Sequence, residues 1–410
     1  MDHPTAEAAM PARTNITWTR RTRLPLIASC ALALTLTACG GSSLGGESDS
    51  DDDGPVRIGL LVPQSGIYTA LGDDMKNAFE MYVDLNDGEL GGREVEIILA
   101  DEGETADSGQ SAATKLIKSD DVHAVTGVVS SAVMNAIKDM VEGDEVPLVG
   151  SNASPTDLVD VEYIWRTSYV NDEPGIALGE HVADAVDGPV YLIAADYQAG
   201  KDEIEGFKET FLPAGGEVEA TVYTPFPGTT NFQPYLAQIQ SSDAAAVFAF
   251  YAGGAAVDFV KQYDDYGLAG NIPLYAPGFL TEGGVLDAQG SSAEDIYTSM
   301  NYSADLDTDV NNEFVEEYVE RFDIEPTTYA VASYDAAAVL DQAIAAVDGD
   351  LTRESLNEAI GAVGEINSPR GPWRFNEGGT PIQTWYLRQV SEVDGELKNS
   401  AIDELGELGD

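Results

Sequence analysis

The sequence predicts an α/β protein made of two doubly wound, parallel-sheet lobes, and three observations support this fold class. Runs that resemble buried strands alternate with segments of helical spacing, which is the pattern of parallel sheets covered by helices on both faces. The pattern restarts once and so forms two blocks of similar length. The chain has 410 residues, of which 43% are hydrophobic, and this is enough for two domains with separate cores.

The first block opens with the apolar run VRIGLLV at 56–62, which we predict to be a buried strand. Segment 73–85 then shows the apolar spacing of a helix. The other predicted elements of this block are strands at 94–100, 122–129 and 147–150 and helices at 108–117 and 132–141. The second block has predicted strands at 190–194, 218–223, 245–250 and 273–276, with helices between them.

The first 38 residues read as a secretory signal peptide. Four arginines precede an apolar run at 24–36, which ends in Leu36-Thr37-Ala38-Cys39. A cysteine after these small residues resembles a bacterial lipobox, which implies that Cys39 is lipidated and becomes the mature N-terminus. The alternative is an ordinary signal peptide with a chance cysteine.

Residues 39–54 read as a flexible, acidic tether, because glycine and serine are followed by a run of aspartates. The stretch at 49–54 resembles the start of a calcium loop. However, the twelfth position of such a loop should be glutamate and is Leu60 here. We therefore expect no metal site in this segment.

The charge of the chain is strongly negative. Lysine and arginine number 20 and the acids number 72, which gives a net charge of −52. Nucleic acid and anionic membrane surfaces are poor partners for such a chain. We expect a salt-rich habitat, where acidic surfaces stay hydrated; the alternative is an ordinary acidic protein. The two cysteines are Cys30, inside the signal peptide, and Cys39, so no disulfide is expected in the mature protein.

The sequence lacks the usual signatures of catalysis. Its three histidines, His3, His123 and His181, lie far apart, and no HExxH, CxxC, GxSxG or phosphate-binding glycine motif occurs. We therefore expect neither an enzyme nor a cofactor or metal site.

A set of short motifs carries a resemblance to a known family. In order, they are VRIGL at 56–60, QSG at 64–66, GD at 72–73, LGGR at 90–93, GVVSS at 127–131, VPLV at 146–149, NASP at 152–155 and WRT at 165–167. Their order and spacing resemble the leucine/isoleucine/valine-binding proteins, which are type I solute receptors of bacterial ABC importers.

This resemblance covers nearly all of the chain after the tether. It implies that the chain crosses between the lobes three times. Lobe 1 would comprise residues 55–170 and 303–378, and lobe 2 would comprise 171–302 and 379–410. The ligand would lie in the cleft at the carboxyl ends of the strands, and the lobes would close on it as a hinge.

In lobe 1, the resemblance assigns the ligand carboxylate to Ser131, Ala153 and Ser154. Ser131 and its neighbour Ser130 stand between a predicted strand and helix, where a hydroxyl and free helix N–H groups can hold an anion. The alternative is that Ser130 or Ser131 only caps the helix. Ala153 and Ser154 could likewise be plain turn residues.

In lobe 2, the family's aromatic loop corresponds to Tyr197, and Tyr251 follows another predicted strand, so both are candidates to cover the ligand. Amino-acid-binding members have a glutamate for the ligand ammonium where this chain has Gly278. Glu282 is four residues further on. Arg370 lies in a segment that is similar to the aromatic-acid-binding branch of the family, and we do not expect it to touch the ligand.

These observations together predict an exported solute-binding lipoprotein that delivers a small carboxylate to ABC permease subunits. The protein would be anchored by lipid on the extracytoplasmic face of the membrane, in the periplasm or at the cell surface. Two ligand classes stay open, a branched-chain amino acid and an aromatic acid. A sensory receptor with the same cleft and a secreted α/β enzyme are the alternative functions.

Overall fold

A computed structural model describes residues 54–409 of the chain. The predicted signal peptide, Cys39 and nearly all of the predicted tether lie outside the described residues.

The first sheet has six strands in the order β2-β3-β1-β4-β5-β6. Its strands are β1 (Val56–Val62), β2 (Glu89–Leu90), β3 (Arg93–Asp101), β4 (Ala124–Gly127), β5 (Leu148–Gly150) and β6 (Ile164–Arg166). All neighbours run parallel except β2 and β3, which form a short antiparallel pair at the edge. The central strands β1 and β4 are almost wholly buried, as their apolar runs predicted.

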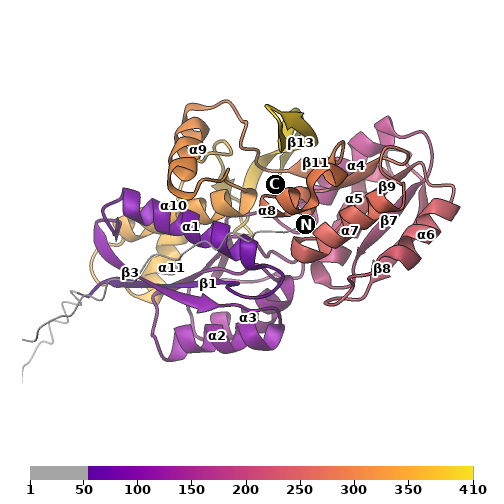
Figure 1. Cartoon of the computed structure of the whole chain (residues 1–410). Helices are drawn as coiled ribbons and strands as arrows, with labels where there is room; N and C mark the ends of the chain where they lie inside the picture. Colours follow the sequence, from indigo (N-terminus) through magenta and orange to yellow (C-terminus); the bar gives the residue numbers. More distant parts are fainter. Residues whose placement is uncertain (1–53, 410) are drawn as a thin grey trace, which may run out of the picture. The chain divides into compact units, whose positions relative to one another are not determined.

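Six helices accompany the first sheet, and together they form lobe 1. They are α1 (Thr69–Leu85), α2 (Ala106–Lys118), α3 (Ser131–Gly143), α9 (Asp309–Phe322), α10 (Thr328–Ala346) and α11 (Arg353–Gly361). Helices α2 and α3 cover one face of the sheet, and α1 and α10 cover the other (Figure 1). The last three helices lie in the second half of the sequence, so the chain returns to lobe 1.

The second sheet has the order β12-β13-β11-β10-β9-β7-β8, and β14 is added beside β13. Its strands are β7 (Val190–Ala195), β8 (Val218–Thr224), β9 (Ala246–Phe250), β10 (Leu274–Pro277), β11 (Tyr297–Met300), β12 (Arg374–Phe375), β13 (Pro381–Val393) and β14 (Glu396–Leu408). The strands from β7 to β11 are parallel.

The helices around the second sheet complete lobe 2. They are α4 (Glu173–Ala185), α5 (Gln198–Phe211), α6 (Gln233–Ser241), α7 (Gly253–Asp265), η1 (Gly278–Thr281), α8 (Gly284–Gln289) and η2 (Gly290–Ala293). Helices α4 and α5 pack together on one face, and the core between the other face and α6, α7 and α8 is rich in aromatic rings.

The fold is therefore α/β, with two doubly wound lobes joined by three crossings of the chain. The first two crossings follow β6 and β11, and the third lies between α11 and β13. The residue boundaries 170, 302 and 378 stay predictions. One feature was not predicted: β13 and β14 form a long antiparallel hairpin at the edge of the second sheet. Asp394 and Gly395 supply the two positive φ angles of its tight turn, and this dipeptide was a signal in the sequence.

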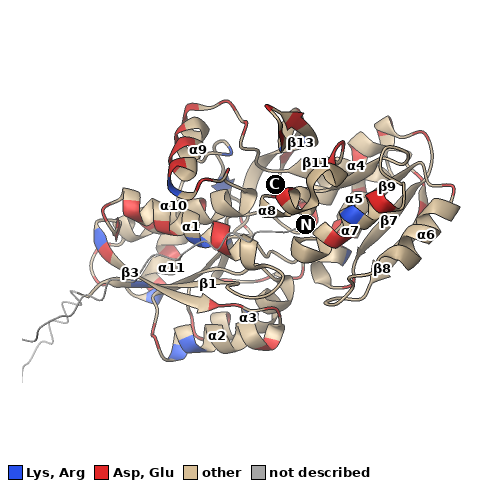
Figure 2. Cartoon of the chain, in the orientation of Figure 1, with Lys and Arg blue, Asp and Glu red and all other residues tan. Residues whose placement is uncertain are grey.

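Acidic side chains are spread over the surface helices and strand edges of residues 54–409, and basic side chains are few (Figure 2). Within the same residues, no helix has both the length and the apolar character that crossing a lipid bilayer requires.

Candidate functional site

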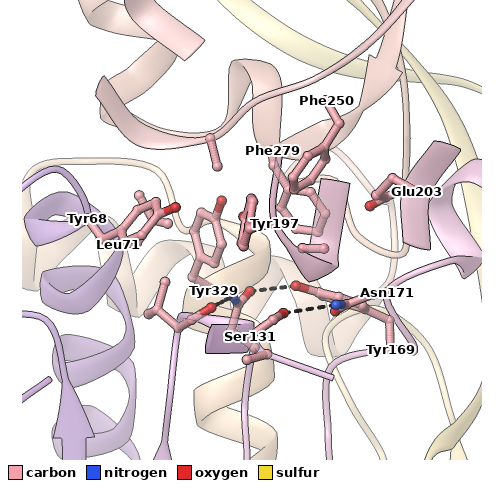
Figure 3. A pocket seen from close by; sticks show the side chains of 15 residues that line it. Tyr68, Leu71, Ser131, Tyr169, Asn171, Tyr197, Glu203, Phe250, Phe279 and Tyr329 are labelled. Carbon is pink, nitrogen blue, oxygen red and sulfur yellow. Dashed lines mark hydrogen bonds between the residues drawn. The ribbon is translucent and has the colours of Figure 1, made fainter. Parts of the chain in front are cut away.

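A cavity lies between the two lobes, close to the carboxyl ends of strands from both sheets (Figure 3). Counted with the solvent space at its open mouth, it has about 370 Å³ of empty space. Its lining residues are Tyr68, Leu71, Val129, Ser131, Asn152, Ala153, Tyr169, Asn171, Tyr197, Ala199, Glu203, Phe250, Ala252, Phe279 and Tyr329.

Several helices begin at this cavity. Helices α1, α3, α5 and α7 start beside the lining residues Tyr68, Ser131, Tyr197 and Ala252, and none of the four has a side-chain cap. The first N–H groups of a helix have no partner within the helix, and its N-terminus carries partial positive charge. Among residues 54–409, no lysine, arginine or histidine lines the cavity. The cavity is therefore suited to an anionic group that is held by N–H dipoles and hydroxyls rather than by a basic side chain.

Ser131 is held in place by a network of hydrogen bonds. Its Oγ accepts from Nδ2 of Asn171 at 2.9 Å, which leaves the serine O–H free to donate to a ligand. The same nitrogen donates to Asp202 at 3.1 Å, and Oδ1 of Asn171 accepts from the backbone N–H of Ser154 at 3.1 Å. Asp202 in turn accepts from the hydroxyl of Thr156 at 2.7 Å. Because Thr156 lies between β5 and β6 of the first sheet and Asp202 lies on α5, this contact also joins the two lobes.

The turn before α3 is fixed by a buried carboxyl group. Glu102 accepts the backbone N–H groups of Val129 and Ser130 at 2.7 and 2.8 Å. Burial raises the pKa of Glu102 to about 8. Ser130 is the N-cap residue but makes no side-chain cap, and Ser131 faces the cavity. The capping interpretation is therefore wrong for both serines.

Six aromatic rings supply most of the apolar wall; they are Tyr68, Tyr169, Tyr197, Phe250, Phe279 and Tyr329. The ring of Tyr169 lies 5.3 Å from that of Phe279, and Tyr197 stacks on Phe226 at 4.1 Å. The hydroxyl of Tyr169 donates to Asn152 Oδ1 at 2.7 Å. Tyr68 from lobe 1 and Tyr197 from lobe 2 both line the cavity, so its wall contains tyrosines of both lobes.

One acidic side chain lines the cavity. Glu203, on α5, has 1% of its surface exposed. Its Oε2 accepts from the backbone N–H of Gly175 at 3.1 Å, whereas its Oε1 has no hydrogen-bond partner among the described residues. Burial raises the pKa of this carboxyl well above its usual range, and the nearby acids Asp172 and Asp202 raise it further.

Three of the six predicted ligand-binding residues, Ser131, Ala153 and Tyr197, are brought together around this cavity. The structure places the other three, Ser154, Tyr251 and Gly278, outside the lining of this cavity. The Ser154 side chain is buried beneath the cavity wall, and its backbone N–H orients Asn171.

Tyr251 and Gly278 do not line the cavity. The Tyr251 ring packs against Phe232 and Phe259 in the core of lobe 2, because the alternation along β9 turns it to the opposite face from Phe250. A Cβ atom on Gly278 would lie only 2.3 Å from Nη2 of Arg388, so glycine makes room for this buried arginine.

The two other charged groups considered in the sequence have partners inside the protein. Glu282 forms a buried ion pair with Arg388 at 2.6 Å and accepts from the backbone N–H of Thr328 at 2.8 Å. Arg370 forms a buried ion pair with Asp335 at 3.2 Å and lies over the ring of Trp373. Neither Glu282 nor Arg370 lines the cavity.

Sequence reasoning missed most of the wall. Asn171 and Tyr169 belong to the first crossing between lobes, and Tyr329 begins α10, far along the chain. Tyr68 lies just before α1. The available signal in the sequence was a hydrophobic residue at the start of a predicted helix. Glu203 gave no signal, because it is one of 72 acids.

Comparison with known proteins agrees with this geometry. Residues 55–396 match the periplasmic binding protein family. The chain is 30% identical over 364 residues to Leu/Ile/Val-binding protein homolog 6 of Brucella melitensis, and the match covers 87% of this chain and 93% of that protein.

Two solved structures from R. palustris are similar over nearly their whole length. One is an ABC transporter solute-binding protein in complex with benzoate, with 33% identity, a TM-score of 0.81 and coverage of 87% of this chain and 98% of that one. The other is a solute-binding protein in complex with 4-hydroxybenzoate, with 28% identity, a TM-score of 0.81 and coverage of 86% and 98%. The chain is a binding protein and not an enzyme, and it belongs to the periplasmic binding protein family, in its type I, Leu/Ile/Val-binding group.

Proposed function

We propose that this protein is an exported, lipid-anchored receptor that binds an aromatic carboxylate of the benzoate class and delivers it to an ABC permease. The observation that carries the proposal is the composition of the cavity. Six aromatic rings surround a space into which helix N-termini and Ser131 direct N–H and O–H groups, without a basic side chain.

The chemistry of such a ligand matches the two kinds of wall. A carboxylate at the start of α3 would accept from the Ser131 hydroxyl and from helix N–H groups, which stabilise negative charge. The ring of the ligand would lie among Tyr169, Phe279 and Tyr197, where offset and edge-to-face contacts add to apolar burial. The ligand would thus contact both lobes and stabilise their closed arrangement.

The related proteins add support. The two R. palustris proteins described above bind benzoate and 4-hydroxybenzoate, and they resemble this chain over more than four-fifths of its length. The predicted amino-acid contact, a glutamate at the position of Gly278, is absent, and Glu282 is already paired with Arg388.

A branched-chain amino acid is the second candidate, because one observation favours it. Glu203 places a carboxyl group in the cavity, and an ionised carboxyl could pair with the ligand ammonium. The similarity to a Leu/Ile/Val-binding protein homolog agrees with this alternative.

The direct experiment is a ligand screen on residues 40–410 in ~1 M salt, which reduces the Debye length to ~3 Å and suppresses repulsion between the many acids. Benzoate, 4-hydroxybenzoate, phenylalanine, leucine and valine would be compared by thermal unfolding and then by calorimetric titration. A ligand at about 100 times its dissociation constant stabilises by ~2.7 kcal/mol. We expect stabilisation by the benzoates and none by leucine. Binding of leucine without binding of either benzoate would overturn the proposal.

The lipid anchor is tested separately. Cys39→Ser should move the protein from the membrane fraction to the soluble extracytoplasmic fraction or leave it unprocessed, because the lipid acceptor is gone. Fractionation with immunodetection and mass analysis of the mature N-terminus would show this. Mature, lipid-bound protein from the Cys39→Ser gene would refute the anchor.

A further inference from the structure

The carboxyl group of Glu203 is a polar group that the fold buries without completing its hydrogen bonds. One oxygen, Oε2, accepts from Gly175, and the other, Oε1, has no partner among residues 54–409 although the side chain is 1% exposed. Buried polar atoms are nearly always hydrogen-bonded, so an open one at a cavity wall marks a place for a ligand or a water. Because Glu203 lines the cavity, Oε1 is available to a bound solute.

The surroundings of Glu203 favour the neutral acid. Its charged neighbours are Asp172 and Asp202, both acids, and no basic side chain lines the cavity. Burial without a counter-charge also disfavours the ionised form. Since the N–H of Gly175 donates to Oε2, that oxygen acts as the carbonyl acceptor, and the proton of the neutral acid belongs on Oε1. The group presented to the cavity is then an O–H donor.

Glu203 and Ser131 stand on different sides of the cavity. Figure 3 shows Ser131 below the rings, next to Asn171, and Glu203 to the right of the rings, past Phe279. The two side chains come from different lobes, Ser131 from the start of α3 and Glu203 from α5. A ligand that contacts both must carry two polar groups separated by an apolar body.

We propose that Glu203 selects aromatic acids that carry a ring hydroxyl opposite the carboxylate, by hydrogen bonding to that hydroxyl through Oε1. This inference rests on the proposed function, in which the carboxylate lies at Ser131. A para hydroxyl is the polar group that a benzoate ring carries farthest from its carboxylate. An α-amino acid does not meet this requirement, because its ammonium and carboxylate are bonded to the same carbon atom.

The test compares benzoate with 4-hydroxybenzoate on wild-type protein, Glu203→Leu and Glu203→Gln by calorimetric titration. Loss of one neutral hydrogen bond corresponds to about a tenfold loss of affinity at most. We expect Glu203→Leu to bind 4-hydroxybenzoate about tenfold more weakly and to bind benzoate within about threefold of the wild type. Glu203→Gln keeps an N–H donor of similar size and should retain the preference for 4-hydroxybenzoate.

Glu209→Leu, an exposed position on the same helix, is the matched control and should change neither affinity. An equal loss of both ligands in Glu203→Leu would assign Glu203 a structural role and overturn the inference. Leucine binding that disappears in both variants would make Glu203 an ammonium partner and overturn it as well. If Glu203→Leu does not fold, loss of the hydroxybenzoate preference in Glu203→Gln decides against the inference. Failure of the wild type to bind either benzoate is a different result, because it removes the proposed function itself.

Discussion

Two buried glutamates of lobe 2, Glu282 and Glu203, differ in how the fold satisfies their carboxyl groups. Glu282 is 5% exposed, and its two oxygens are taken by Arg388 and by the backbone N–H of Thr328. Glu203 is 1% exposed, has no basic partner and leaves one oxygen open. Both oxygens of Glu282 are thus used within the fold, whereas one oxygen of Glu203 remains available to a ligand.

The helix N-termini show the same contrast. Away from the cavity, α2 and α11 begin with complete capping boxes, made by Thr105 with Ser108 and by Thr352 with Ser355. At the cavity, α1, α3, α5 and α7 begin without a side-chain cap, whereas α10, which also begins there, is capped by Thr327. At α3 a hydroxyl is within reach, because Ser130 is the N-cap residue, but it does not cap the helix. Four helix starts without a side-chain cap therefore gather at one cavity, where their first N–H groups can meet a bound ligand.

The largest expected effect is a loss of stability at the buried ion pair between Arg388 and Glu282. Arg388→Met should leave Glu282 buried and unpaired, and breaking a buried ion pair in this way destabilises a protein by about 3–5 kcal/mol. Urea unfolding in ~1 M salt would measure the loss. Arg374→Met, at an exposed arginine, is the control and should change stability by less than ~0.5 kcal/mol. A similarly small loss in Arg388→Met would erase the distinction between the two glutamates.

Much of the fold was predictable because its signals are local. The run at 56–62 and the periodicity at 73–85 correspond to β1 and to most of α1. A central parallel strand is apolar throughout and an amphipathic helix is apolar on one face, so each can be recognised from a pattern in consecutive residues. The hairpin of β13 and β14 was missed, because its long strands mix buried and exposed residues without a clean alternation.

The cavity was predictable only in part, because its wall is assembled from distant segments. Ser131 and Tyr197 follow strands and start helices, which is a pattern visible in the sequence. Tyr329 and Glu203 reach the cavity from helices whose sequence pattern reports only that one face is buried. Gly278 shows the reverse case, since its position in a family motif suggested ligand contact but its space is used by Arg388.

The second effect is a pH dependence of the free energy of unfolding that the Glu203 carboxyl should cause. Because the folded chain keeps a proton that the unfolded chain loses above about pH 4.3, wild-type stability falls as pH rises, until the raised pKa of Glu203 is passed. Glutamine has no such proton. The stability of Glu203→Gln relative to wild type should therefore increase with pH, by about 1.4 kcal/mol per unit over this range.

Urea unfolding of both proteins in ~1 M salt, from about pH 5 to about pH 8, tests the slope. Glu209→Gln, at an exposed acid on the same helix, should keep a constant difference from wild type. A constant difference for Glu203→Gln as well would mean that this carboxyl is ionised in the folded protein, like an ordinary surface acid.

The smallest expected effects distinguish a helix start without a side-chain cap at the cavity from a capped helix start away from it. Ser131→Ala removes a hydroxyl that faces the cavity, so carboxylate affinity should fall by ~1–3 kcal/mol, the usual loss for a hydrogen bond to a charged group. Thr105→Ala removes a cap at the start of α2 and should lower stability by ~1 kcal/mol while leaving affinity unchanged. Titration with the ligand that binds best in the screen gives the change in affinity of each variant, and urea unfolding gives the change in stability of each variant. Equal affinity losses in the two variants, or unchanged affinity in Ser131→Ala, would show that the open start of α3 has no special part in binding.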